Sequence, residues 1–173
     1  MIEFLKTLYG NKFFFYSNSL FFLPSYFKYF FKIISTEKAK SKFLKIHLKK
    51  FDVHYLEKRS KQFSKTISKF YFPDAKKFLC EINHEKCIVS ASLDIWMIDI
   101  AKELGCKLIC TKTIFKNGFF YDIGTNCSNE KKVIEIKKKF DLKKYSEIHV
   151  FGNSEGDKKM LDLGTNKYYK YFK

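Results

Sequence analysis

The chain has 173 residues, 46% of them hydrophobic, which is enough for one ordinary core but not for two large domains. Its formal net charge is +16, from 34 basic and 18 acidic residues, and Arg59 is the only arginine. A positive chain attracts anionic partners, but arginine is the residue whose planar fork best reads base edges and grips phosphates. Its scarcity argues against nucleic acid as the partner.

The cysteines and the N-terminus indicate a cytoplasmic protein. Five cysteines are an odd number, and none of them has the C-x-x-C spacing of a zinc or dithiol site. They are Cys80, Cys87, Cys106, Cys110 and Cys127. The first ten residues include Glu3 and lack the basic and apolar regions of a signal peptide. We therefore expect reduced thiols.

Residues 1 to about 72 are predicted to form a helical bundle, because apolar residues recur there at helical spacing. One such face carries Ile2, Leu5, Leu8 and Tyr9, and a second carries Phe43, Leu44, His47, Leu48 and Phe51. Arg59, in the last part of this region, is predicted to be solvated rather than to bind a substrate anion.

The segment from Phe13 to Ile34 is unusually aromatic. It is nearly long enough to span a membrane, but Pro24 and two lysines near its end argue against this. Phe and Tyr with lysines nearby are also typical of a helix that lies in the plane of a membrane surface. A peripheral membrane contact through residues 13–34 is therefore one alternative. The alternative that we favour is that these aromatic residues pack a helical subdomain and line its contact with the core.

The pattern changes at Pro73, which can occupy the first turn of a helix. Periodicity and turn residues then predict, in chain order, a helix at 73–83, strands at 87–90 and 107–111 with a helix at 93–104 between them, a hairpin at 115–120, a helix at 130–140, a strand at 148–151 and a short last strand near 167–169. Alternating strands and helices favour a mainly parallel sheet covered on both faces. Residues 73–173 are thus predicted to be an α/β core. In it we expect Trp96 to pack and His149 to be a core or surface histidine rather than a catalyst.

Three polar residues follow the predicted elements where a parallel sheet binds ligands, beyond the carboxyl ends of its strands. Ser90 ends the first strand, Lys132 lies near a helix start, and Asp157 belongs to the loop after the strand at 148–151. A phosphoryl group needs a hydroxyl or amide donor, a compensating cation and usually Mg²⁺ held by oxygen ligands. Together the three side chains could supply all of these.

With these residues the chain resembles the haloacid dehalogenase-like (HAD) phosphatases. Ile88-Val-Ser-Ala-Ser92, Asn126-Cys127 with Lys132, and Phe151-Gly-Asn-Ser-Glu-Gly-Asp157-Lys-Lys-Met-Leu161 are similar to the family's second, third and fourth motifs. The phosphoserine-phosphatase-like branch is the most similar, and residues 1–72 resemble the helical cap of that branch. The resemblance implies a Rossmann-like α/β core with an N-terminal helical cap, and Mg²⁺-dependent hydrolysis of a small phosphorylated metabolite.

The resemblance also implies roles for individual residues. Lys132 would be the catalytic cation, and Ser90, Ala91 and Ser92 would bind the phosphoryl group together with it. Asp157 and Asn153 would be the Mg²⁺ ligands, in a loop shaped by Ser154 and Gly156.

The family's first motif, D-x-D-x-T, is missing from the sequence. It supplies the nucleophile and the acid/base, and the first aspartate here is Asp52, inside the helical region. In the family the strand before this motif is central, between the strands that here end at Ser90 and near Phe151, so two inner edges should be unpaired. We expect an N-terminal truncation, with activity if the segment upstream of Met1 is supplied. The alternatives are an inactive remnant or phosphate-binding module, and a basic aromatic membrane-surface protein. The oligomeric state stays open.

Overall fold

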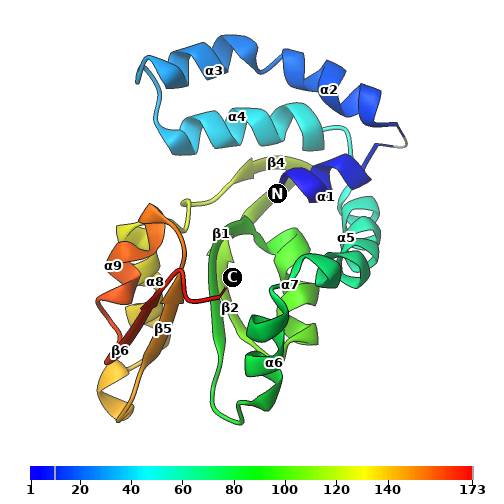
Figure 1. The fold of residues 1–173 in the computed structure, drawn as a ribbon. Coiled ribbons are helices and arrows are strands. Elements are labelled where there is room, and N and C mark those ends of the chain that lie inside the picture. Colours follow the sequence, from blue (N-terminus) through cyan, green and yellow to red (C-terminus); the bar gives the residue numbers. More distant parts are fainter. Residues whose placement is uncertain (10, 173) are drawn as a thin grey trace.

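The computed structural model describes residues 1–9 and 11–172, and its N-terminal part is helical (Figure 1). The helices before the first strand are α1 (Ile2–Thr7), α2 (Lys12–Leu20), α3 (Leu23–Phe30), α4 (Thr36–Leu48), α5 (Val53–Ile67), the short 3-10 helix η1 (Ser68–Phe70) and α6 (Pro73–Glu81).

Local capping explains where the two longest helices begin. The Ser35 hydroxyl accepts a hydrogen bond from the Lys38 backbone N–H at the start of α4, and the Asp52 carboxylate accepts one from Tyr55 N–H (2.8 Å) at the start of α5. Pro73 is the first residue of α6, as predicted.

The strands are β1 (Cys87–Leu93), β2 (Lys107–Thr111), β3 (Thr113–Lys116), β4 (Phe119–Ile123), β5 (His149–Gly152) and β6 (Asn166–Tyr169). Between and after them lie α7 (Asp94–Glu103), α8 (Glu130–Lys139), η2 (Leu142–Lys144), η3 (Glu155–Asp157) and α9 (Lys158–Leu161). Every strand and helix predicted after residue 72 is present, with bounds that differ by a few residues at most.

The strands pair two by two. Within the described residues, β1 pairs with β2 and β5 with β6, both in parallel, whereas β3 and β4 form an antiparallel hairpin. Asn117 and Gly118 form its turn, with φ of 52° and 79°. Glycine and asparagine are the residues that tolerate this left-handed region best, so the predicted turn is confirmed.

The parallel sheet is divided where the sequence predicted a missing strand. In the part of the chain that the structure describes, β1 and β5 belong to separate two-stranded sheets, and no strand lies between them. Edge strands carry backbone N–H and C=O groups without partners in a ladder. Among the described residues, β1 and β5 each therefore have one edge without a partner strand.

Two clusters of buried apolar side chains differ in size. The larger joins the N-terminal helices to α7 and to the hairpin, and the smaller lies under β2, α8 and α9. The buried members of the smaller cluster are Ile109, Cys127, Ile136 and Met160. Trp96 is 1% exposed in the larger cluster and stacks on Phe4, which confirms that it packs.

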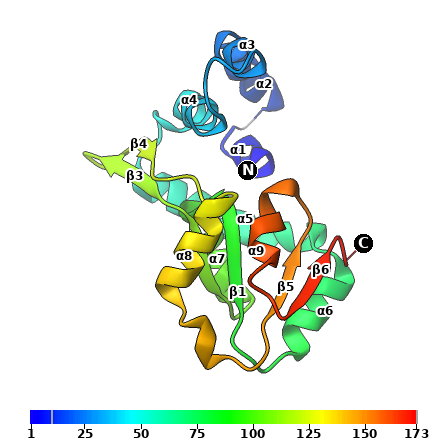
Figure 2. The ribbon, with the colours of Figure 1, turned by 90° about the vertical axis from the view of Figure 1, so that its left-hand side faces the viewer.

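The favoured prediction for residues 13–34 is wrong. Phe15 is buried and Phe22 packs on Phe43, but most of the other aromatic side chains of this segment are exposed. Helices α2 and α3 lie on α4, at the end of the molecule away from the parallel strands (Figures 1 and 2). With α4 between them and the core, only one side of the pair finds a partner. No helix of the described residues is both long and apolar enough to cross a bilayer.

The division into a cap at 1–72 and a core at 73–173 stays a prediction. Helix α5 packs against α7, so the helical region and the strand region share the larger cluster.

Candidate functional site

A bulge shapes the carboxyl end of β1. The parallel register with β2 is regular up to Ser90 and shifts before Leu93, which leaves Ala91 and Ser92 in the irregular stretch. The Ser92 backbone N–H donates a hydrogen bond to Ser90 Oγ (3.1 Å). A hydroxyl that accepts one hydrogen bond still has its own O–H to donate. Ser90 can therefore offer that donor to an anion.

Lys132 and Asp157 form a buried ion pair. Lys132 Nζ lies 2.6 Å from Asp157 Oδ1, and the two side chains are 8% and 9% exposed. Lys132 Nζ also donates to the Val89 carbonyl (3.0 Å). Asp157 Oδ2 accepts from the backbone N–H groups of Asn153 (3.1 Å) and Ser154 (3.0 Å), and from the Ser154 hydroxyl (2.7 Å). The pair thus ties the start of α8 to the ends of β1 and β5.

These hydrogen bonds keep Asp157 ionised. Burial alone would raise the pKa of its carboxyl group, but the hydrogen bonds from Lys132 and Ser154 outweigh that effect and lower the pKa below its ordinary value. Asp157 is therefore a carboxylate at neutral pH.

The backbone around the pair is tightly fitted. A Cβ on Gly152 would lie 2.7 Å from Asp157 Cβ, so only glycine allows the end of β5 to approach Asp157 this closely. Asn129, which precedes α8, has φ of 49°, and its N–H donates to the Gly156 carbonyl (3.1 Å). The helix that carries Lys132 is thereby joined to the loop that carries Asp157.

A cavity of about 430 Å³ brings most of the predicted site residues together. Its polar part is lined by Ser90, Ala91, Lys132, Gly152, Asn153, Ser154 and Asp157, and its wall includes the aromatic residues Phe72, Phe151, Tyr168, Tyr171 and Phe172. Ser92 does not line it. Because Val89 of β1 and Phe151 of β5 both line the cavity, it lies between these two strands, which do not pair with each other.

A second polar network, which the sequence did not suggest, lies beside the bulge. Thr111, fully buried at the end of β2, donates to the Ala91 carbonyl (2.9 Å). Lys40 of α4 donates to the same carbonyl and to Asn126 Oδ1 (2.6 Å for the latter). Burial lowers the pKa of the Lys40 ammonium to about 8. The position of Thr111 at the end of its predicted strand could have identified it as a site residue from the sequence. Nothing in the sequence distinguished Lys40 from the other lysines.

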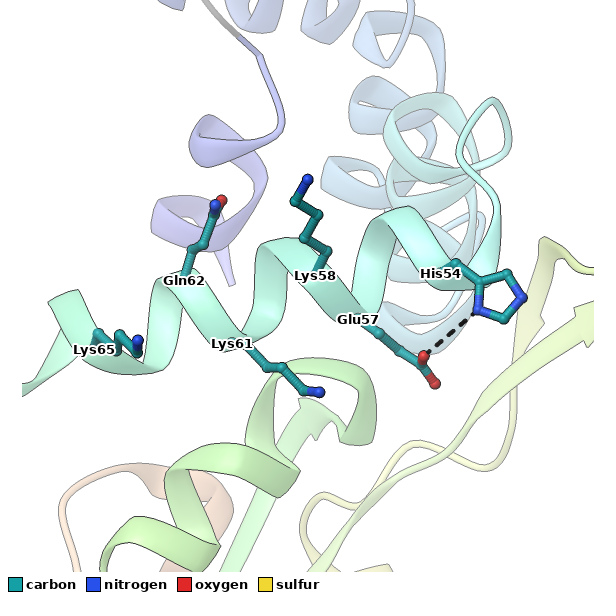
Figure 3. Close-up of a pocket in the computed structure, with 6 residues that line it drawn as sticks. All are labelled: His54, Glu57, Lys58, Lys61, Gln62 and Lys65. Carbon is teal, nitrogen blue, oxygen red and sulfur yellow. Dashed lines mark ion pairs between the residues drawn. The ribbon is translucent and has the colours of Figure 1, made fainter.

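A depression of about 340 Å³ on α5 is of a different kind (Figure 3). Its lining comes from one exposed helix face, namely His54, Glu57, Lys58, Lys61, Gln62 and Lys65. The figure shows these side chains extending separately from the helix, and the drawn ion pair joins His54 to Glu57 at 4.0 Å. Solvated side chains on one face do not form a preorganised site, so we assign no function to it.

Two other residues considered from the sequence lie elsewhere. Arg59 donates to Gln62 Oε1 (2.9 Å) and lies over the Tyr55 ring. His149 is partly exposed, beside Glu147 and stacked on Tyr168. Neither lines the cavity.

The donor set at the cavity is small but fits Mg²⁺. Within residues 1–9 and 11–172, no group of three or more His, Cys, Asp or Glu side chains is placed so that it could hold a metal ion. Mg²⁺, however, is commonly bound by one or two carboxylates plus phosphate oxygens and water. Asp157 Oδ1 accepts one hydrogen bond and so has a lone pair to spare, and Asn153 lines the same cavity.

The fold and this site define an α/β protein of Rossmann-like type, with a buried Lys–Asp pair at the carboxyl ends of its parallel strands. A family model described as haloacid dehalogenase-like hydrolase matches residues 10–162. The chain therefore belongs to the haloacid dehalogenase-like hydrolases, as the resemblance implied.

Solved structures with a similar fold share little sequence with it. A crystal structure of a protein of unknown function from Bordetella pertussis Tohama I aligns with a TM-score of 0.68 at 19% identity, over 80% of this chain and 67% of that one. A phosphoserine phosphohydrolase-like protein from Francisella tularensis subsp. tularensis SCHU S4 aligns with a TM-score of 0.54 at 16% identity, over 82% and 75%. At these identities the likeness concerns the fold. No curated protein matches the chain significantly.

Proposed function

We propose that this site belongs to a Mg²⁺-dependent phosphomonoester hydrolase of the phosphoserine-phosphatase-like branch, acting on a small phosphorylated metabolite in the cytoplasm. The observation that carries the proposal is the buried Lys132–Asp157 pair in one cavity with Ser90. A cation, a carboxylate and a free hydroxyl hydrogen at the ends of parallel strands are what a phosphate and its metal ion require.

Each residue would have a distinct part in that reaction. The Ser90 hydroxyl and the backbone at Ala91 would hold the phosphoryl oxygens, while the Lys132 ammonium would offset their charge. Asp157 and Asn153 would hold Mg²⁺, which when bound stabilises negative charge on the phosphoryl oxygens. Residues 1–72, the proposed cap, would select the substrate.

The nucleophile is the part that these residues do not supply. The 173-residue sequence contains no D-x-D pattern, and none of the cavity's residues other than Asp157 is a carboxylate. We propose that a strand carrying this pattern, encoded upstream of Met1, completes the sheet between β1 and β5. The two unpaired inner edges and the cavity between them support this arrangement.

The test separates phosphate binding from turnover. Inorganic phosphate would be titrated into the 173-residue chain with Mg²⁺, and hydrolysis of an aryl phosphate would be assayed for this chain and for one extended by the residues encoded directly upstream. We expect phosphate binding by both chains and turnover only by the extended chain.

Matched variants make the result specific. Lys132→Ala should weaken phosphate binding about tenfold or more, because it removes the charge-assisted hydrogen bond, whereas the exposed Lys137→Ala should not. Ser90→Ala leaves the ion pair intact and removes the other phosphate donor. It therefore tests phosphate binding even if Lys132→Ala fails to fold. Absence of phosphate binding by both chains would exclude the proposal.

The second candidate is a phosphate-binding module without catalysis, which the missing D-x-D favours. It predicts that both chains bind phosphate and that neither hydrolyses the ester. Turnover by the extended chain would reject this alternative.

A further inference from the structure

The proposed reaction does not explain the exposed apolar face on α2 and α3. None of the eight residues of α3, all of them described, is buried, and Phe15 is the buried residue of α2. The exposed large apolar residues of this face, which we call the aromatic face, are Phe13, Phe14, Tyr16, Leu20, Phe21, Leu23, Tyr26, Phe27, Tyr29, Phe30, Phe31 and Ile33. A large number of exposed apolar residues gathered on two neighbouring helices usually marks an interaction site.

The charge of the same segment has one sign. Between Glu3 and Glu37 the sequence contains no acidic residue, while Lys12, Lys28 and Lys32 are exposed within or beside the aromatic face. Its charge is therefore complementary to an anionic surface.

The position of the aromatic face suits a broad, flat partner. Helix α4 covers one side of the α2–α3 pair, and the pair lies at the outer end of the molecule (Figures 1 and 2). The two helices have 9 and 8 residues, too few for either to span a bilayer. Short helices with aromatic residues and lysines are able to lie in the headgroup region instead.

A second copy of the chain fits this face less well. Two copies that met through it would bring Lys12, Lys28 and Lys32 of each near those of the other, without an acidic residue in the segment to pair with them. Like charges brought together in an interface destabilise it. Anionic lipid satisfies both the apolar and the cationic residues.

We propose that the aromatic face binds the surface of a membrane containing anionic lipids, with the Phe side chains among the headgroups and the lysines against lipid phosphates. This contact would hold the protein at a membrane through α2 and α3 and leave the strand region in water. It is independent of the proposed hydrolase activity, since none of these residues lines the cavity.

The test is co-sedimentation of the 173-residue chain with vesicles at low salt. Vesicles of equal parts phosphatidylcholine and phosphatidylglycerol should bind the protein, and vesicles of phosphatidylcholine alone should bind it much more weakly. Phe21→Ser with Phe31→Ser changes two highly exposed aromatic residues of the face, one on each side of α3, at 73% and 67%. This double variant should reduce the affinity for anionic vesicles about tenfold or more.

Two matched controls lie outside the face. Phe70→Ser with Tyr121→Ser removes two exposed aromatic residues elsewhere and should leave binding unchanged. Lys12→Gln with Lys28→Gln should weaken binding more than Lys137→Gln with Lys143→Gln, although both pairs remove the same charge. Circular dichroism and gel filtration would establish that each variant is folded.

Three results would overturn the proposal. They are no binding to anionic vesicles, equal loss of binding in the control variants, and self-association in the absence of lipid that Phe21→Ser with Phe31→Ser abolishes. The last result would assign the aromatic face to a second copy of the chain.

Discussion

The helical region and the strand region bury their apolar surface to different extents. The larger apolar cluster joins α1, α4, α5, α7 and the β3–β4 hairpin, whereas the smaller has four buried members under a divided sheet. The helical region nevertheless leaves a whole face of aromatic residues exposed. Hydrophobic composition alone therefore does not show which residues stabilise the fold, because the same residue types serve as core on one side of α4 and as surface on the other.

The largest expected effect comes from the larger cluster. Trp96→Ala should lower the free energy of unfolding by about 4 kcal/mol, because it removes a fully buried ring stacked on Phe4 and leaves a cavity. Urea unfolding followed by circular dichroism measures this. If Trp96→Ala lowered the free energy of unfolding no more than the substitution of an exposed residue does, the cluster would not hold the two regions together.

The next effect tests the strand region. Lys132→Ala should cost about 3 kcal/mol of unfolding free energy, since it leaves the buried Asp157 carboxylate without its cation. Lys132→Ala with Asp157→Asn should recover part of that loss compared with the sum of the two single variants, because both charges are then removed. Additive losses in this double-mutant cycle would contradict a direct coupling between the two side chains.

A smaller effect should appear on acidification. His47 is fully buried against Phe15 and Phe43, with Nδ1 2.8 Å from the Tyr9 hydroxyl, and burial lowers its pKa to about 4 from 6.5. Between these two values the unfolded chain binds a proton that the folded chain does not, so stability falls as the pH falls.

From pH 6.5 to 4.5 this linkage amounts to about 2 kcal/mol. His47→Phe should remove that part of the pH dependence, as measured by urea unfolding at each pH. The lowered pKa of Asp157 acts in the same direction, but mainly as the pH falls below the ordinary value of 3.8, so it contributes little between pH 6.5 and 4.5. An unchanged slope in His47→Phe would show that His47 is not the group responsible.

The smallest effect sharpens the contrast between the two sides of α4. Phe21→Ser should change the unfolding free energy by less than about 0.5 kcal/mol in the absence of lipid, because Phe21 is 73% exposed. Thermal or urea unfolding would detect a larger loss, and such a loss would mean that the aromatic face is covered in solution.

Much of the strand region could be predicted from sequence. Strand and helix periodicity, the Asn117-Gly118 turn and Pro73 are local signals, and local signals identify elements well. Motif order was sufficient to bring Ser90, Lys132, Asn153 and Asp157 together before any geometry was known. Ser92 is the exception, since a bulge follows Ser90 and Ser92 does not line the cavity.

What the sequence determined by itself was therefore the order of elements, the family resemblance and the absence of a D-x-D pattern from these 173 residues. Only the tertiary structure decided that α4 covers one side of the aromatic segment and leaves the other exposed. It also decided that Lys40 reaches the bulge from the helical region. The physical reason is that exposure and long-range contacts depend on how separate elements pack, and the apolar residues of a helix do not by themselves indicate what covers them.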